Sequence, residues 1–147
     1  MPDGQTHCGV VSVLGAPNAG KSTLVNRLVG AKVSIVSPKV QTTRIRVRGV
    51  ALLEQTQIIY VDTPGIFVPK RRLDRAMVDA AWGGASDADA IILLVDARRG
   101  VDPDTRRIAE GLNDRGEAAT LVINKVDTVR REALLALAEE LNGLAKF

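Results

Sequence analysis

Short apolar runs recur along the chain and predict five β-strands. These runs cover residues 8–14, 44–48, 57–61, 90–95 and 119–123. Residues 90–95 are apolar throughout, which is typical of a central parallel strand covered on both faces. Residues 44–48 alternate instead between arginine and an apolar residue, which predicts an edge strand with one face in water. The arginines favour protection of that edge over contact with phosphate, although both roles remain open.

Between the strands, apolar residues spaced three or four positions apart predict helices. Gly30 fits the end of the first helix, and Asp102 followed by Pro103 fits the start of a later one. Thr128 is expected to cap the last helix. Strands that alternate with helices predict an α/β fold, a mostly parallel sheet with helices on both faces. The inner faces of the predicted helices carry Leu24, Val25 and Leu28; Leu73, Met77 and Ala80; Ile108 and Leu112; and Leu134, Leu137, Ala138, Leu141 and Leu144.

A glycine-rich stretch follows the first predicted strand and opens the first predicted helix. Residues 15–22 read Gly-Ala-Pro-Asn-Ala-Gly-Lys-Ser, which is the spacing of a phosphate-binding loop. In such a loop, successive backbone N–H groups and the positive end of the helix surround an anion. Lys21 is expected to reach the β- and γ-phosphates, and the Ser22 hydroxyl to ligate Mg²⁺. An accidental glycine turn is disfavoured because both flanks fit the motif.

Two further polar segments follow predicted strands, and each matches part of a nucleotide site. Residues 62–65 read Asp-Thr-Pro-Gly, in which Asp62 would hold Mg²⁺ through water and the N–H of Gly65 would bind the γ-phosphate. Residues 124–127 read Asn-Lys-Val-Asp, in which the Asp127 carboxylate would accept two hydrogen bonds from guanine. Adenine lacks that donor pair, so guanine is favoured. Each segment alone could be an ordinary turn, but all three motifs lie at carboxyl ends of strands, where ligands bind in α/β sheets.

The residues between these motif positions are also expected to link the parts of the site. Lys125 can lay its stem along the base and reach back to the phosphate loop, while Asn124 would tie the two loops together.

Composition limits the other classes of function. The 147 residues fit about one domain, and a net charge of +3 permits an acidic or RNA partner without demanding one. The single cysteine, Cys8, excludes a disulfide within this sequence and predicts a reduced, packed thiol, with the cytosol as the default location. Residues 1–7 predict a loose polar tail without a secretory signal. The longest apolar run, residues 90–95, is too short to span a bilayer.

The three motifs look like those of translation-factor-related GTPases, and their details closely resemble the Era family of bacterial GTPases. The resemblance rests on residues 15–24, on Ser-Pro-Lys-Val-Gln-Thr-Thr-Arg at residues 37–44, and on residues 62–65. The Gln-Thr-Thr-Arg part is the most specific, and the resemblance covers nearly all of residues 8–147. It implies a P-loop, Ras-like G domain followed by an RNA-binding KH domain. It also implies GTP hydrolysis coupled to binding of 16S ribosomal RNA and the 30S subunit, in the cytoplasm, with peripheral contact at the inner membrane face left open.

Carried over by position, the resemblance implies particular roles for several residues. Thr43, aligned on the following Arg44, would ligate Mg²⁺ in the GTP state. Ile66 stands where Ras-like enzymes place a water-orienting glutamine, so unaided hydrolysis should be slow. Asn18 resembles the asparagine of relatives that use K⁺, so K⁺ should accelerate the reaction. The implied catalytic residues are Lys21, Thr43 and Gly65, and the implied metal ligands are Ser22, Thr43 and Asp62. The implied nucleotide-binding residues are Gly15, Ala16, Pro17, Asn18, Ala19, Gly20, Lys21, Ser22, Thr23, Asp62, Thr63, Pro64, Gly65, Ile66, Asn124, Lys125, Val126 and Asp127.

The last part of the sequence departs from the family pattern. A complete G domain has one more strand and a Ser-Ala-type loop against guanine, and nothing after Asp127 supplies either. We therefore expect residues 8–147 to be an incomplete Era-type G domain without its last strand or a KH domain, and guanine affinity to be reduced. The leucines of the last helix are expected to be partly exposed. They are Leu134, Leu137, Leu141 and Leu144.

Three functions fit these residues to different degrees. In the first, GTP with Mg²⁺ orders residues 37–43 and 63–70, and hydrolysis releases them. In the second, the chain binds nucleotide or ribosomal RNA with negligible turnover. The third, a phosphate-loop ATPase, is disfavoured by Asp127. The basic residues available for RNA docking are Lys39, Arg44, Arg46, Lys70, Arg71 and Arg72.

Overall fold

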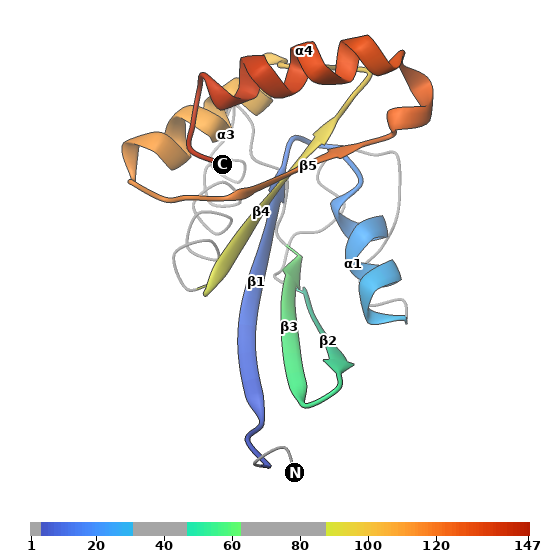
Figure 1. The fold of residues 1–147 in the computed structure, drawn as a ribbon, viewed down its shortest axis with the longest axis vertical. Coiled ribbons are helices and arrows are strands. Elements are labelled where there is room, and N and C mark those ends of the chain that lie inside the picture. The colour runs from blue at the N-terminus through green and yellow to red at the C-terminus, as the bar shows by residue number, and fades with distance from the viewer. Residues whose placement is uncertain (1–3, 31–46, 63–87) are drawn as a thin grey trace, which may run out of the picture.

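The computed structural model describes residues 4–30, 47–62 and 88–147, and its strands form one five-stranded sheet (Figure 1). Their order across the sheet is β2-β3-β1-β4-β5. Neighbouring strands are parallel except for β2 and β3, which are antiparallel. The mostly parallel sheet predicted from the sequence is therefore confirmed. The strands are β1 (His7–Gly15), β2 (Val47–Leu53), β3 (Thr56–Asp62), β4 (Ala90–Asp96) and β5 (Thr120–Asn124).

Helices pack on both faces of this sheet. The described helices are α1 (Lys21–Val29), α3 (Pro103–Asp114), α4 (Arg131–Asn142) and the short 3₁₀ helix η1 (Val126–Thr128). Successive residues of a strand point to opposite faces, so the neighbours Val13 and Leu14 of β1 enter different core clusters. Val13 packs with Val25 of α1. Leu14 belongs to the cluster that contains Ile108 of α3 and Leu141 of α4.

The ends of two helices follow the sequence predictions, and one does not. Gly30 closes α1 in the left-handed conformation, with φ 77°. The Asp102 side chain accepts a hydrogen bond from the N–H of Thr105, at 2.8 Å, and caps α3. The prediction that Thr128 caps the last helix is wrong, because the chain first makes the 3₁₀ turn η1 and α4 begins after Arg130. The Thr128 hydroxyl instead donates a hydrogen bond to the carbonyl oxygen of Lys125.

The predicted edge strand is present in the described residues. β2 occupies the edge of the sheet, as predicted, and its described part, Val47–Leu53, includes the last two residues of the predicted run and continues beyond it. A tight turn joins it to β3, where Leu53 pairs with Thr56 and the left-handed Glu54 has φ 53°. The hairpin turn therefore fixes the antiparallel register of β2 and β3. Residues 44–46 and the predicted helix after residue 70 lie outside the described residues.

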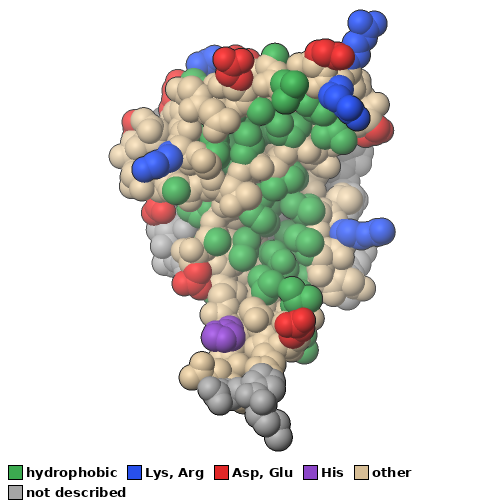
Figure 2. Space-filling view, viewed as in Figure 1, with side chains coloured by type: hydrophobic (Ala, Val, Ile, Leu, Met, Phe, Trp, Pro, Cys, Tyr) green, Lys and Arg blue, Asp and Glu red, His purple; other side chains and the backbone are tan. Residues whose placement is uncertain are grey.

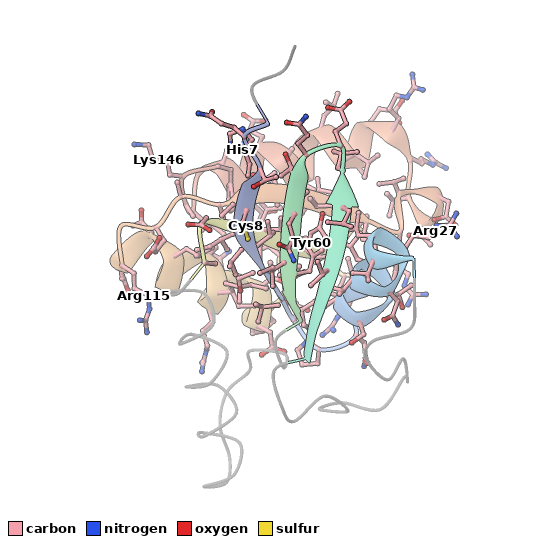
Figure 3. All side chains as sticks on the ribbon, turned by 90° about the horizontal axis from the view of Figure 1, so that it is seen from below. His7, Cys8, Arg27, Tyr60, Arg115 and Lys146 are labelled. Carbon is pink, nitrogen blue, oxygen red and sulfur yellow. The ribbon has the colours of Figure 1, made fainter. Side chains whose placement is uncertain are left out.

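The thiol of Cys8 is exposed, so the prediction of a packed thiol is wrong. Figure 1 shows the first part of β1 running beyond the region where α1, α3 and α4 pack. Figure 3 places His7 and Cys8 at this end of β1. The apolar residues that follow in β1 are buried only farther along the strand, where the helices cover it.

The inner face of α4 is better covered than the sequence suggested. Leu137 and Leu141 are buried in the cluster formed with α3, so their expected partial exposure is wrong. Leu134 packs against the same cluster and is half-buried, as is Leu144. Figure 2 shows a band of hydrophobic side chains at the surface of the visible face, so not every apolar side chain is covered. Within the described residues, we find no helix long and apolar enough to cross a membrane.

Candidate nucleotide-binding site

The loop between β1 and α1 needs glycine at two positions for different reasons. A Cβ added to Gly15 would lie 2.7 Å from the carbonyl oxygen of Leu94 on the neighbouring strand β4. Gly20 has φ 108°, and a Cβ there would lie 2.5 Å from Nδ2 of Asn124. Gly20 precedes α1, so no side-chain oxygen caps the first turn of that helix. The loop thus offers the backbone N–H groups of a helix start to an anion.

Lys21 lies on this loop and is almost fully buried, with 7% of its surface exposed. Its Nζ donates hydrogen bonds to the carbonyl oxygens of Gly15, at 2.9 Å, and Ala16, at 3.0 Å. Lysine is seldom buried unless its charge has partners, and here two carbonyl oxygens of the loop are those partners. The contacts hold a positive charge over the loop where a phosphate group would be attracted. Ser22 and Thr23 follow in the first turn of α1.

The polar segment after β5 reaches the same loop. Nδ2 of Asn124 donates a hydrogen bond to the carbonyl oxygen of Ala19, at 2.9 Å. Nζ of Lys125 donates to the carbonyl oxygen of Asn18, also at 2.9 Å. The expected linkage of the two loops by Asn124 and the return of Lys125 to the phosphate loop are both present. Lys125 adopts a left-handed backbone with φ 59°, which is uncommon for a residue with a Cβ and occurs often at functional sites.

Asp96 completes this link and was missed in the sequence. It ends β4 and pairs in register with Asn124 of β5. Its Oδ2 accepts a hydrogen bond from Nζ of Lys125 at 3.0 Å, and its Oδ1 accepts one from the N–H of Arg98 at 2.9 Å. Burial raises the pKa of the Asp96 carboxyl, but these hydrogen bonds and the Lys125 charge outweigh it and hold the pKa below its ordinary value. In α/β sheets, ligands bind at the carboxyl ends of the strands. Asp96 directly follows the apolar run at residues 90–95, so this rule identifies it as a candidate site residue.

Arg99 is a second residue that the motifs do not contain. It follows Asp96 in the turn between β4 and α3, and its Nη1 donates a hydrogen bond to the carbonyl oxygen of Pro17, at 3.0 Å. Its Nη2 lies 2.8 Å from Oδ2 of Asp102, the residue that caps α3. No signal in the sequence separates Arg99 from Arg98 or the other surface arginines, because the contact depends on the path of the turn.

Asp127, the residue expected to choose the base, lies in η1 and is exposed. Val126 beside it is 48% exposed. The carboxyl end of β3 places Asp62 in register with Val13 of β1, two residues before the phosphate loop begins. The sheet therefore brings the predicted segments to one edge. The remaining predicted site residues lie outside the described residues: Thr43, Thr63, Pro64, Gly65 and Ile66.

Comparison with known proteins agrees with this arrangement. The model of the 50S ribosome-binding GTPase family matches residues 10–125. GTPase Era of Sinorhizobium medicae is 61% identical over 142 residues, which are 97% of this chain and 46% of that protein. GTPase Era of Rhizobium meliloti is also 61% identical, over 97% of this chain and 45% of that protein. This chain spans about half the length of these curated relatives.

Two solved structures are similar to the fold described above. A crystal structure of Era in complex with MgGDPNP and nucleotides 1506–1542 of 16S ribosomal RNA matches with a TM-score of 0.86 and 40% identity, over 95% of this chain and 48% of that chain. A variant of Aquifex aeolicus Era bound to GDP.AlF4- matches with a TM-score of 0.84 and 40% identity, over 94% of this chain and 48% of that chain. The resemblance to the Era family, first suggested by the motifs, is confirmed.

Proposed function

This chain belongs to the family of 50S ribosome-binding GTPases, and we propose that it binds a guanine nucleotide and hydrolyses GTP to GDP and phosphate. One observation carries the proposal. Asn124 and Lys125, from the segment expected to read the base, donate hydrogen bonds to two consecutive carbonyls of the phosphate loop. A ligand with a purine at one end and phosphates at the other fits two loops that are held together in this way.

In this proposal the two ends of the nucleotide meet different groups. The phosphates lie against backbone N–H groups of residues 15–23, among which Pro17 has none, and against the Lys21 ammonium, which stabilises charge as the γ-phosphoryl group leaves. The Asp127 carboxylate accepts hydrogen bonds from guanine, and the Lys125 stem lies along the base. Gly65 and Thr43 are proposed to contact the γ-phosphate and the metal in the GTP state, and Ile66 leaves water orientation to other groups.

The residues at this edge of the sheet fit Mg²⁺, which prefers oxygen ligands. Ser22 lies in the first turn of α1, and Asp62 ends the strand next to β1. We propose Ser22, Thr43 and Asp62 as the residues that hold the ion, Asp62 through water. When bound, Mg²⁺ would supply positive charge to the β- and γ-phosphate oxygens.

Single-turnover phosphate release tests the proposed hydrolysis. The 147-residue chain is loaded with GTP and Mg²⁺, and release is compared with that of Asp62→Ala. We expect slow release by the natural chain and a loss of about tenfold or more in the variant. GTP that stays intact on both proteins would instead favour the second candidate, a binding module without turnover. This candidate is considered because the chain spans only 46% of the length of the relative.

A monovalent cation is a further proposed activator. Asn18 is exposed and has a left-handed backbone with φ 65°, and its carbonyl is already engaged by Lys125. We propose that its side chain helps to place K⁺ beside the β- and γ-phosphates. Hydrolysis should therefore be faster in K⁺ than in Na⁺ at equal ionic strength, and equal rates would contradict the proposal.

The proposed partners beyond the nucleotide are 16S ribosomal RNA and the 30S subunit. Support comes from the similarity to Era, one structure of which holds a 16S fragment. We propose residues 8–147 as an incomplete Era-type G domain located in the cytoplasm, and peripheral contact at the inner membrane face stays an open alternative. Affinity for that RNA fragment should fall steeply with salt if basic side chains carry the contact, and salt-independent binding would argue against it.

A further inference from the structure

Arg99 lies outside the three motifs, yet its side chain donates a hydrogen bond to the carbonyl oxygen of Pro17 in the phosphate loop. We propose that Arg99 is a positioning residue, which fixes the phosphate loop in its anion-binding conformation before the nucleotide arrives. This inference rests on the proposed function, because it assigns Arg99 to that same site. Arg99 does not touch the nucleotide in this proposal; it acts through the backbone of Pro17.

The peptide geometry gives this contact its effect. A trans peptide is planar, so its C=O and the N–H of the next residue point in opposite directions. The bond from Arg99 to the carbonyl oxygen of Pro17 therefore aims the N–H of Asn18 the other way. The bond from Asn124 to the carbonyl oxygen of Ala19 does the same for the N–H of Gly20. The N–H groups of Asn18 and Gly20 are thus oriented by the side chains of Arg99, in the turn after β4, and Asn124, at the end of β5, and both lie in the stretch of backbone that would surround an anion.

The Arg99 side chain is 41% exposed, but contacts at both ends of its guanidinium hold it in place. Its Nη2 pairs with Oδ2 of Asp102 at 2.8 Å, and Oδ1 of Asp102 accepts the N–H of Thr105. Oδ1 of Asp102 thus accepts the cap hydrogen bond, while Oδ2 meets Arg99 as an ion pair without hydrogen-bond geometry. The planar guanidinium can serve Pro17 and Asp102 at once, whereas the single ammonium of lysine is poorly suited to both.

Arg98 offers a matched control in the same turn. It is exposed, and its backbone N–H donates to Asp96. Among the described residues, we find no hydrogen bond or ion pair of its side chain. Replacing it removes the same charge one position away, so any difference from Arg99 reports the Pro17 and Asp102 contacts rather than the net charge of the turn.

The test measures GDP dissociation from the 147-residue chain by chasing a fluorescent GDP analogue with excess GDP. We expect Arg99→Ala to release GDP about tenfold faster, which corresponds to about 1.4 kcal/mol, and Arg98→Ala to stay within about twofold of the natural chain. Arg99→Lys should lie between them, because lysine keeps one donor. The thermal unfolding midpoints of the nucleotide-free Arg98→Ala and Arg99→Ala proteins should be similar.

A second readout separates positioning from general loosening. GMP lacks the β-phosphate that the loop would surround, so Arg99→Ala should lower the ratio of GDP to GMP affinity about tenfold. A merely structural loss would weaken both nucleotides alike and leave the ratio unchanged, which would overturn the inference. If Arg99→Ala does not fold, the ratio of GDP to GMP affinity is measured for Arg99→Lys instead. A ratio equal to that of Arg98→Ala would overturn the inference. If the natural chain and Arg98→Ala bind no GDP, the proposed function and the inference both fail; if they bind and Arg99→Ala matches them, only the inference fails.

Discussion

The two ends of the candidate site differ in how firmly the described residues hold them. At the phosphate end, Lys21 is buried, and the side chains of Arg99, Asn124 and Lys125 hold the loop carbonyls. At the base end, Asp127 and Val126 are exposed on a three-residue 3₁₀ helix. The comparison indicates that the phosphate end is preorganised, and we propose that the base end decides which nucleotide is accepted. Preorganisation favours binding because less ordering is needed when the ligand arrives.

Removing Lys21 should have the largest effect on this comparison, because it removes the buried charge of the phosphate end. We expect Lys21→Ala to weaken GDP binding by about 2–5 kcal/mol, a loss of roughly 30-fold or more. Calorimetric titration measures it, with Lys146→Ala as the control, since Lys146 is exposed and distant in the fold from the loop. Unchanged GDP affinity in Lys21→Ala would contradict the proposal that the phosphates bind at this loop.

Gly20→Ala should break the contact between the two ends. The new Cβ would lie 2.5 Å from Nδ2 of Asn124 at φ 108°. We expect a loss of about 2–3 kcal/mol in the free energy of unfolding, measured by urea denaturation, because strain and the displaced Asn124 add together. Gly116→Ala is the matched control: it also has positive φ, but its Cβ would meet nothing within 4 Å, so about 1 kcal/mol is expected. Equal losses would show that the Asn124 contact does not matter.

Asp127→Asn should change the base end and leave the phosphate end alone. The amide offers a donor where the carboxylate only accepts, so guanine loses a partner and xanthine, with a carbonyl in place of the exocyclic amine, gains one. We expect GDP affinity to fall by about 1–3 kcal/mol and xanthosine diphosphate affinity to rise. Competition against a fluorescent nucleotide measures both. A gain for xanthine cannot come from unfolding; loss of both nucleotides would contradict the separate roles.

Asp96→Asn should give the smallest effect, because it only loosens the link through Lys125. The folded-state pKa of Asp96 is lowered from its ordinary value of 3.8, so ionised Asp96 stabilises the fold at neutral pH. That contribution is present above the unfolded pKa and is lost as the pH falls through the lower folded pKa. We expect a difference of about 1 kcal/mol between the two proteins at pH 7, shrinking below about pH 4. Denaturation curves across this range would show a pH-independent difference if the carboxylate has no such role.

Sequence reasoning found the parts of the site that depend on local spacing. The glycines and Lys21 follow from the loop motif, and the return of Lys125 to the loop follows from the order of strands and turns. Asp96 depends on the pairing of β4 with β5, and Arg99 on the path of one turn. Asp96 could have been found, because it directly follows the apolar run at residues 90–95, whereas the path of the turn that carries Arg99 is not encoded in any local pattern.

The mistaken predictions have the same origin. Thr128 has the chemistry of a cap, but the 3₁₀ turn places the helix start after Arg130. Cys8 lies in an apolar run, yet the described helices do not cover that end of β1. Propensity and pattern identified the elements, while burial depended on which helices cover which part of the sheet.

Competition of nucleotides for the 147-residue chain shows whether the phosphate end provides binding and the base end provides selection. A fluorescent GDP analogue is bound with Mg²⁺ and displaced by GDP, ADP or pyrophosphate. If the phosphate end binds and the base end selects, GDP displaces the analogue at the lowest concentration, while ADP and pyrophosphate need at least about 100-fold more. Displacement by ADP at the same concentration as GDP would show that Asp127 does not select the base.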